Sequence, residues 1–101
     1  MLNLDVSPDA YAEIDDAVTY LNAQSVGLGD EFYDALSAAI DEVRRSPNNS
    51  LPGDYGTRMR KIAPFRYLLV FEQLDDVLQV IAVVHERQRP GYWRSRTTWD
   101  D

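Results

Sequence analysis

The strongest pattern in the chain is the apolar run of residues 77–85, which ends at a histidine. Both alternating sets of positions are mostly apolar and rich in β-branched residues, and this pattern predicts a strand that is buried on both faces. One set consists of Leu78, Val80, Ala82 and Val84, and the other of Val77, Ile81 and Val83. Cations, a proline and two aromatic residues follow directly, so we expect the functional rim of the molecule at the end of this strand.

Shorter alternating patterns predict the remaining strands. Leu2, Leu4 and Val6 alternate with polar residues, which is typical of a short strand with one buried face. Two strands are expected at about 57–63 and 67–72, before the strand at 77–85. Because tight turns join these last three strands, they form an antiparallel meander.

Two stretches between the first strand and the meander have helical periodicity. Ser7 is a helix cap and Pro8 suits the first helical position. A turn is expected at 22–29, and Ser46 and Pro47 end the second helix. The short connection predicts that the two helices pack antiparallel as a hairpin. The apolar stripes consist of Ala10, Ile14, Ala17, Val18 and Leu21 in the first helix, and of Leu28, Phe32, Leu36, Ala39, Ile40 and Val43 in the second.

These elements predict a single α+β domain over residues 1–101. Its order is strand, helix, helix, strand, strand, strand, with the helical hairpin on one face of a mainly antiparallel sheet. Phe32, Leu36 and Ile40 are expected to face the sheet near Leu69 and Val80. Residues 94–101 have no pattern, and we expect them to form a frayed tail.

Charge is distributed unevenly along the chain, whose net charge is −7. Residues 1–57 contain 11 acidic and 2 basic residues, whereas residues 58–96 contain 4 acidic and 8 basic residues. The chain has no cysteine, which suits a reducing cytoplasm, and it has neither a secretory signal pattern nor an apolar run long enough to cross a membrane. We therefore expect a cytoplasmic protein with an acidic and a basic region.

The basic residues of the meander are candidates for binding. Arg58 and Arg60 alternate on one strand and should project from the same face. Together with the other cations they would form a concave surface for phosphates or an acidic peptide, or else a solvated face that is balanced by the acids of the protein itself. The complete set is Arg58, Arg60, Lys61, Arg66, Arg87 and Arg89.

His85, Tyr92 and Trp93 each allow two interpretations. His85 is the only histidine, and it is either an acid–base group or a cap at the end of the sheet. Tyr92 and Trp93 either stack on bases or fold back onto the core, and the second alternative is favoured. We expect neither a metal site nor a cofactor, and we assign Glu13, Asp15 and Asp16 to solvation.

The order of these motifs resembles the ParE/RelE superfamily of toxins from type II toxin–antitoxin systems. The similar segments are residues 29–36 with the stop at Pro47, Arg58 with residues 64–67 leading to Phe71, and residues 80–93. The resemblance implies an α+β toxin that binds a cognate antitoxin in a hetero-oligomer. From the charge distribution we expect the antitoxin or the target to be bound by Arg58, Arg60, Arg66, Arg87, Arg89, Tyr92 and Trp93.

The two branches of this superfamily have different targets. RelE-like members cut messenger RNA on the ribosome, and the residues carried over for that reaction are Arg58, Arg60, Lys61, Arg66 and His85. ParE-like members inhibit DNA gyrase, with no cleavage chemistry of their own. The net charge of −7 opposes docking on ribosomal RNA and favours the ParE-like branch. A non-toxic interaction module with the same fold is a third hypothesis.

Overall fold

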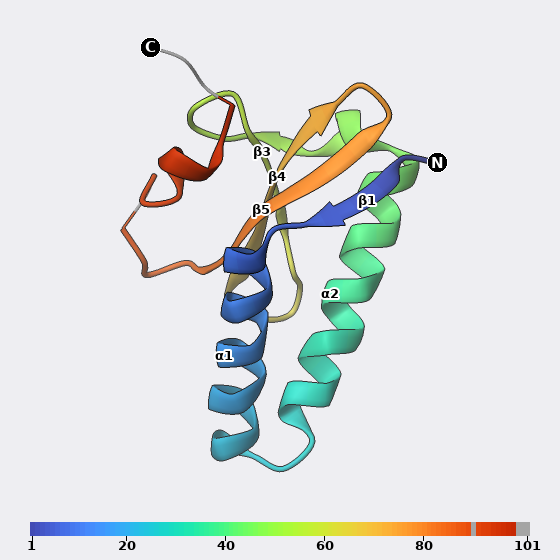
Figure 1. Ribbon diagram of the computed structural model, residues 1–101. Coiled ribbons are helices and arrows are strands. Elements are labelled where there is room, and N and C mark those ends of the chain that lie inside the picture. The colour runs from blue at the N-terminus through green and yellow to red at the C-terminus, as the bar shows by residue number, and fades with distance from the viewer. Residues whose placement is uncertain (90, 99–101) are drawn as a thin grey trace.

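The computed structural model describes residues 1–89 and 91–98, which form two long helices and one five-stranded sheet (Figure 1). The strand order across the sheet is β1-β5-β4-β3-β2. β1 runs parallel to β5, and the other neighbouring strands are antiparallel. The predicted α+β class and the mainly antiparallel meander are therefore confirmed. In chain order the elements are β1 (Asn3–Val6), α1 (Pro8–Gln24), α2 (Leu28–Arg45), the 3₁₀ turn η1 (Pro47–Asn49), β2 (Leu51–Pro52), β3 (Arg58–Lys61), β4 (Tyr67–Leu74), β5 (Val77–His85) and the 3₁₀ turn η2 (Arg94–Arg96).

The helical hairpin forms as its sequence predicts. The Ser7 hydroxyl accepts a hydrogen bond from the Ala10 amide at 3.1 Å, and this bond caps α1. At the other end of the hairpin, the side chain of Asn22 accepts a bond from the Gly29 amide at 2.8 Å. A Cβ atom at Gly29 would lie 2.6 Å from the Val18 carbonyl oxygen, so glycine permits the close approach of the two helices.

Both helices pack on the same face of the sheet, and the main core lies between them and the strands. Phe32 of α2 is fully buried, and its ring lies 5.3 Å from that of Phe65 and 4.9 Å from that of Tyr67. Leu69 and Val80 belong to the same cluster, so the predicted packing of α2 on the sheet is confirmed.

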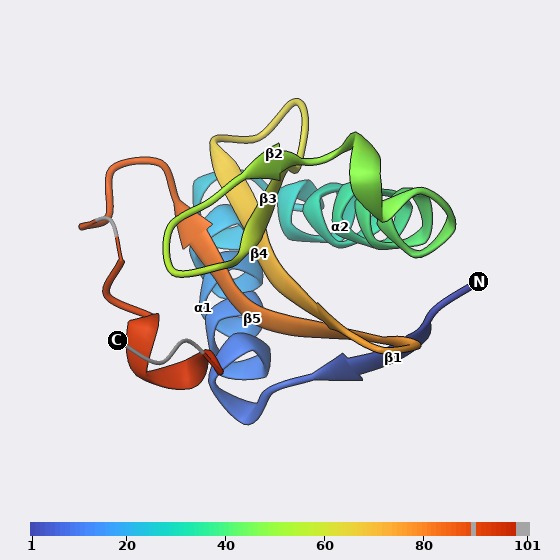
Figure 2. The same ribbon diagram turned by 90° about the horizontal axis from the view of Figure 1, so that it is seen from above.

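The opposite face of the sheet is covered by residues 91–98, which we call the C-terminal strap. Figure 2 shows the strands between α2 and the red C-terminal segment. Trp93 is only 3% exposed and packs on a second cluster formed by Val70, Ile81, Ala82 and Val84. The expected frayed tail is therefore wrong for residues 94–98, because η2 and its side-chain contacts order them. Residues 99–101 lie outside the described part of the chain.

A β-bulge changes which residues of β5 face the helices. Val70 pairs with Ala82, but the next residue of β4, Phe71, pairs with Val80, so Ile81 is the additional residue. Ile81 and Ala82 both contribute to the cluster under the strap. The strict alternation predicted for β5 is therefore wrong beyond Val80.

Candidate functional site

The structure divides the basic residues of the meander between the two faces of the sheet. Arg58 pairs with Phe71 and Arg60 with Leu69, so both arginines project toward the helices, as their shared register predicts. Arg60 donates to the Glu42 carboxylate of α2, and Arg58 donates to the Ser50 carbonyl oxygen at 3.4 Å. Arg60 is thus paired with a charge of the protein itself, whereas the partner of Arg58 is a neutral carbonyl group.

A second group of cations lies where β3 and β5 end and β4 begins. We call it the basic end and define it as Lys61, Arg66, Arg87 and Arg89. Lys61 projects from the face opposite Arg60, and its amine lies 3.7 Å from the Glu86 carboxylate. The Arg66 carbonyl oxygen accepts from the Glu86 amide at 2.9 Å, which holds the two loops together, and Arg66, Arg87 and Arg89 are exposed. The expected single basic surface is therefore two separate groups.

His85 lies on the helix side of this end, and its described contacts are structural. Its Nδ1 accepts a hydrogen bond from the Arg87 amide at 3.1 Å, and its own amide donates to the Gln88 side chain at 2.7 Å. Its ring meets that of Tyr67 edge to face, with centroids 5.1 Å apart. These bonds make His85 a cap that shapes the following turn.

The surroundings of His85 do not suit a polyanion. A cavity of about 250 Å³ beside it is lined by two carboxylates and two phenols. Burial, together with the neighbouring Tyr20, raises the pKa of Tyr67 above its usual value. The lining residues include no arginine or lysine to attract a phosphate, and the Asp16 carboxylate repels one, so this cavity does not favour an RNA backbone. The lining consists of Glu13, Asp16, Ala17, Tyr20, Tyr67, Val83, His85 and Gln88.

On the opposite face, Trp93 leaves only a small cavity of about 90 Å³. Met59, Leu68 and Val84 line this cavity with Trp93, and Tyr55 meets the indole ring edge to face at 5.9 Å. Of the two alternatives for Trp93, the structure takes the fold-back onto the core. Its ring is therefore not displayed for stacking on bases.

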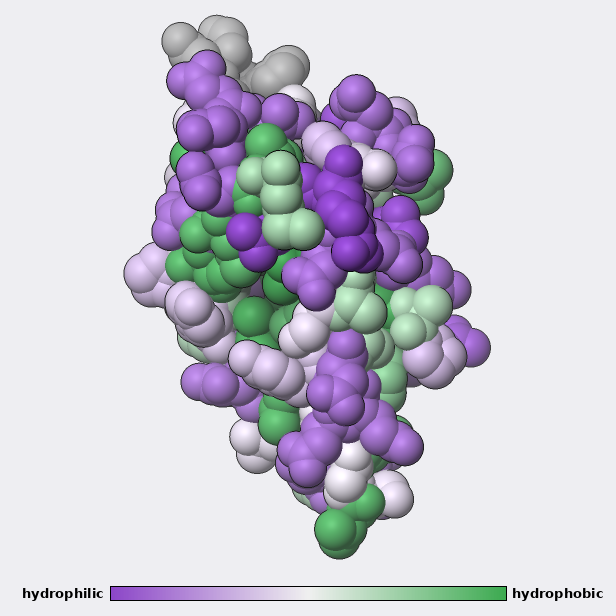
Figure 3. All heavy atoms as spheres, turned by 90° about the vertical axis from the view of Figure 1, so that its right-hand side faces the viewer, coloured by the Kyte–Doolittle hydropathy of each residue, from purple (hydrophilic) through white to green (hydrophobic). Residues whose placement is uncertain are grey.

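A groove that the sequence pattern does not predict runs between the two helices and β1. Its volume is about 290 Å³, and it contains exposed apolar side chains: Leu4 is 41% exposed, Tyr11 59% and Tyr33 55%. Figure 3 shows a patch of hydrophobic atoms among hydrophilic ones on the side of α2 and the N-terminus. The two tyrosines flank the apolar stripes of the helices, and this position is the signal in the sequence from which the groove could have been predicted. The complete lining is Leu4, Val6, Tyr11, Ile14, Asp15, Tyr33, Leu36, Ser37, Ile40 and Asp41.

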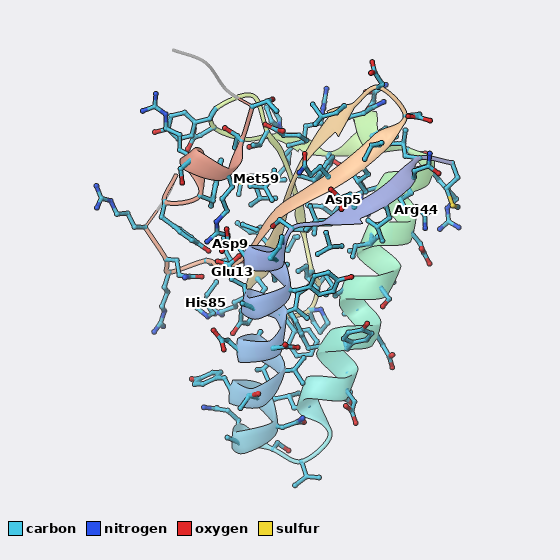
Figure 4. All side chains as sticks on the ribbon, viewed as in Figure 1. Asp5, Asp9, Glu13, Arg44, Met59 and His85 are labelled. Carbon is cyan, nitrogen blue, oxygen red and sulfur yellow. The ribbon has the colours of Figure 1, made fainter. Side chains whose placement is uncertain are left out.

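The prediction that Glu13 serves only solvation is wrong. Its carboxylate accepts hydrogen bonds from Val83, Tyr92 and Arg96, and its side chain is only 18% exposed. Figure 4 shows Glu13 on α1 facing the C-terminal segment, with His85 nearby.

Neither a metal-ligand cluster nor a membrane-spanning helix occurs in residues 1–89 and 91–98. These residues contain no group of three or more side chains suited to holding a metal ion. In the same part of the chain, neither helix has the length and apolarity needed to cross a bilayer.

Comparisons with known proteins agree with this architecture. A family model described as the ParE toxin of type II toxin–antitoxin system, parDE, matches residues 4–90. No curated protein matches the sequence. A solved structure titled "Chromosomal ParDE TA system from P. aeruginosa" is similar with a TM-score of 0.74 and 11% identity, over 84% of this chain and 96% of that chain. At this identity the structural similarity shows the fold, whereas the family match covers most of the sequence.

Proposed function

Because the chain belongs to the ParE toxin family of type II toxin–antitoxin systems, we propose that it inhibits DNA gyrase and is neutralised by a cognate antitoxin. In this proposal it acts in the cytoplasm as a binding protein and forms a toxin–antitoxin hetero-oligomer. No cofactor takes part.

The observation that carries this proposal is the dispersal of the residues that an RNA-cleaving site would need. Arg58 and Arg60 project toward the helices, whereas Lys61 lies on the other face of the same strand. A general acid or base must lie within hydrogen-bonding reach of the reacting group. His85 instead caps a turn beside an acidic cavity, so the arrangement favours inhibition by binding.

The basic end is the surface that we assign to the target. Arg66, Arg87 and Arg89 are exposed, and a guanidinium group forms bidentate bonds with carboxylates. Tyr92 lines a cavity together with Arg89, and its hydroxyl group is hydrogen-bonded to Glu13. We therefore expect its ring to border the surface that meets the target. Trp93 lines the same small cavity as Arg89, so it adjoins this surface from the buried side.

The groove is the surface that we assign to the apolar part of the antitoxin, because exposed apolar patches of this kind mark sites of protein association. Arg58 and Arg60 lie beside α2 and are assigned to acidic residues of the same partner.

Replacing both Arg58 and Arg60 by glutamate is expected to raise the dissociation constant of the antitoxin at least about tenfold, or about 1.4 kcal/mol. Titration calorimetry measures this change. An unchanged affinity, with loss of binding in Tyr33→Asp, would assign the antitoxin to the groove alone.

Gyrase inhibition tests the proposed function directly. The purified protein should inhibit DNA supercoiling by gyrase, and the antitoxin should reverse this inhibition. His85→Ala should inhibit as strongly as the wild type, because His85 has no chemical role in this proposal. Cleavage of ribosome-bound messenger RNA that is lost in His85→Ala would establish the nuclease alternative. Unimpaired growth of cells that express the protein without antitoxin would indicate a non-toxic module.

A further inference from the structure

The Glu13 carboxylate connects segments that are far apart in the sequence. It accepts a bond from the Val83 amide at 3.1 Å, from the Tyr92 hydroxyl, and from Arg96 Nη1 at 2.8 Å. These partners lie 70, 79 and 83 residues away along the chain. A side chain that were merely solvated would have no such set of partners.

The need for these bonds arises where β1 ends. β1 pairs with β5 only as far as Val80, while β5 continues to His85. The exposed edge beyond Val80 would leave strand amides and carbonyls without partners. Side chains replace the absent strand: Ser7 and Arg96 donate to the Ile81 carbonyl oxygen at 3.3 and 3.2 Å, and Glu13 accepts from Val83.

The same carboxylate holds the chain on both sides of residues 86–89, which we call the basic loop. Val83 lies just before residues 86–89, and Tyr92 and Arg96 lie just after them. A loop whose two ends are fixed to one group loses much of its conformational freedom. Arg87 and Arg89 are exposed within this span, so the direction of their guanidinium groups depends on how its ends are held.

Charge strengthens this attachment. Arg96 is only 20% exposed and forms an ion pair with Glu13 at 2.8 Å, while Asp9 lies farther away at 3.5 Å. The Tyr92 hydroxyl donates to the same carboxylate, and burial together with this hydrogen bond raises the pKa of Tyr92 far above its usual value. Loss of the carboxylate charge would leave a largely buried arginine with a weaker partner.

We propose that Glu13 is a positioning residue for the basic loop, and that its carboxylate fixes the geometry in which Arg87 and Arg89 meet a target. The proposal rests on the proposed function for the identity of that target. Glu13 itself does not touch the target. It acts through the two ends of the loop.

The test compares Glu13→Gln with the wild-type protein in three measurements. Glutamine keeps the shape but removes the charge, so the half-inhibitory concentration for gyrase supercoiling should rise about tenfold, whereas antitoxin affinity should stay unchanged. Trypsin cleavage after Arg87 should accelerate several-fold in the folded variant. Asp16→Asn is the matched control on the same helix and should behave as the wild type in all three measurements.

Each outcome decides the proposal. Wild-type inhibition and wild-type proteolysis in Glu13→Gln would overturn the positioning role and leave the proposed function intact. A parallel loss of gyrase inhibition and antitoxin binding would also overturn it, because Glu13 would then support only the fold. If the wild-type protein does not inhibit gyrase, the proposed function fails, and the proteolysis result alone decides whether Glu13 positions the loop. Should Glu13→Gln not fold, Tyr92→Phe removes one of the same bonds and is judged by the same three measurements.

Discussion

The helix side of the sheet is closed by two long amphipathic helices, whereas the other side is closed by the short C-terminal strap. On the helix side, Phe32 and Leu36 are buried among apolar neighbours. On the strap side, Trp93 supplies one large apolar group, and the carboxylates of Glu13 and Glu72 hold the chain around it. One face is thus stabilised mainly by buried area and the other also by specific polar attachments, so the two faces should respond differently to substitution.

The largest expected effect is on the helix side. Phe32→Ala should lower the free energy of unfolding by about 3–5 kcal/mol, because a fully buried ring is lost from a closed core. Denaturant unfolding followed by circular dichroism measures this change. Tyr33→Ala is the matched control: the residue is 55% exposed, so the loss should be below about 1 kcal/mol. Equal losses in the two variants would contradict the assigned face of α2.

A smaller global effect is expected on the strap side. Trp93→Ala should lower the free energy of unfolding by less than Phe32→Ala does, that is, by less than about 3 kcal/mol. The reason is that the strap can detach while the helix side remains folded. Hydrogen exchange should accelerate at the amides of Arg94 and Arg96, which bond within the strap, and remain slow in the middle of α2. Equally accelerated exchange in α2 would show that the two faces unfold as one unit.

The smallest expected effect is a loss of stability at alkaline pH, which arises from the hydrogen bond between Tyr92 and Glu13. The usual pKa of a tyrosine is 10.0, and burial together with the Glu13 hydrogen bond raises that of Tyr92. The folded state therefore holds this proton more tightly than the unfolded state does. The resulting stabilisation is complete below pH 10 and is lost as the pH rises from 10 through the folded pKa.

Tyr92→Phe isolates this contribution. The difference in unfolding free energy between the wild type and Tyr92→Phe should shrink as the pH rises above about 10, because phenylalanine has no proton to lose. Urea unfolding at several alkaline pH values measures the difference. A difference that does not vary with pH would show that the hydroxyl does not depend on Glu13.

The contrast between the faces also explains what could be predicted from the sequence. The stripe through Phe32, Leu36 and Val43 is a local pattern, so the hairpin and its buried face followed from periodicity. The bulge between Val70 and Phe71 leaves no comparable local signal, and the faces of β5 were therefore wrong beyond Val80. β2 was missed because two residues, one of them proline, give no periodic pattern.

The candidate site was predictable in its residue types but not in its grouping. That Arg58 and Arg60 share a face follows from the geometry of a strand. Which face of the sheet the helices cover does not follow from it, so the sequence could not show that these two arginines project toward the helices, where Arg60 meets Glu42. The partners of Glu13 lie at least 70 residues away, and no local pattern distinguishes it from a solvated acid such as Asp16.

The parallel pairing of β1 with β5 has a consequence for the order of events during synthesis. Ser7 bonds to Ile81, which is made 74 residues later. At about 5–20 residues per second, that interval lasts about 4–15 s. Throughout it the first strand has no partner in the sheet, and the groove that β1 helps to line does not yet exist. A nascent chain can complete its helical hairpin early through local contacts, but it acquires the groove and the basic end together and late. An antitoxin that recognises the groove would therefore bind the toxin only after translation had passed β5.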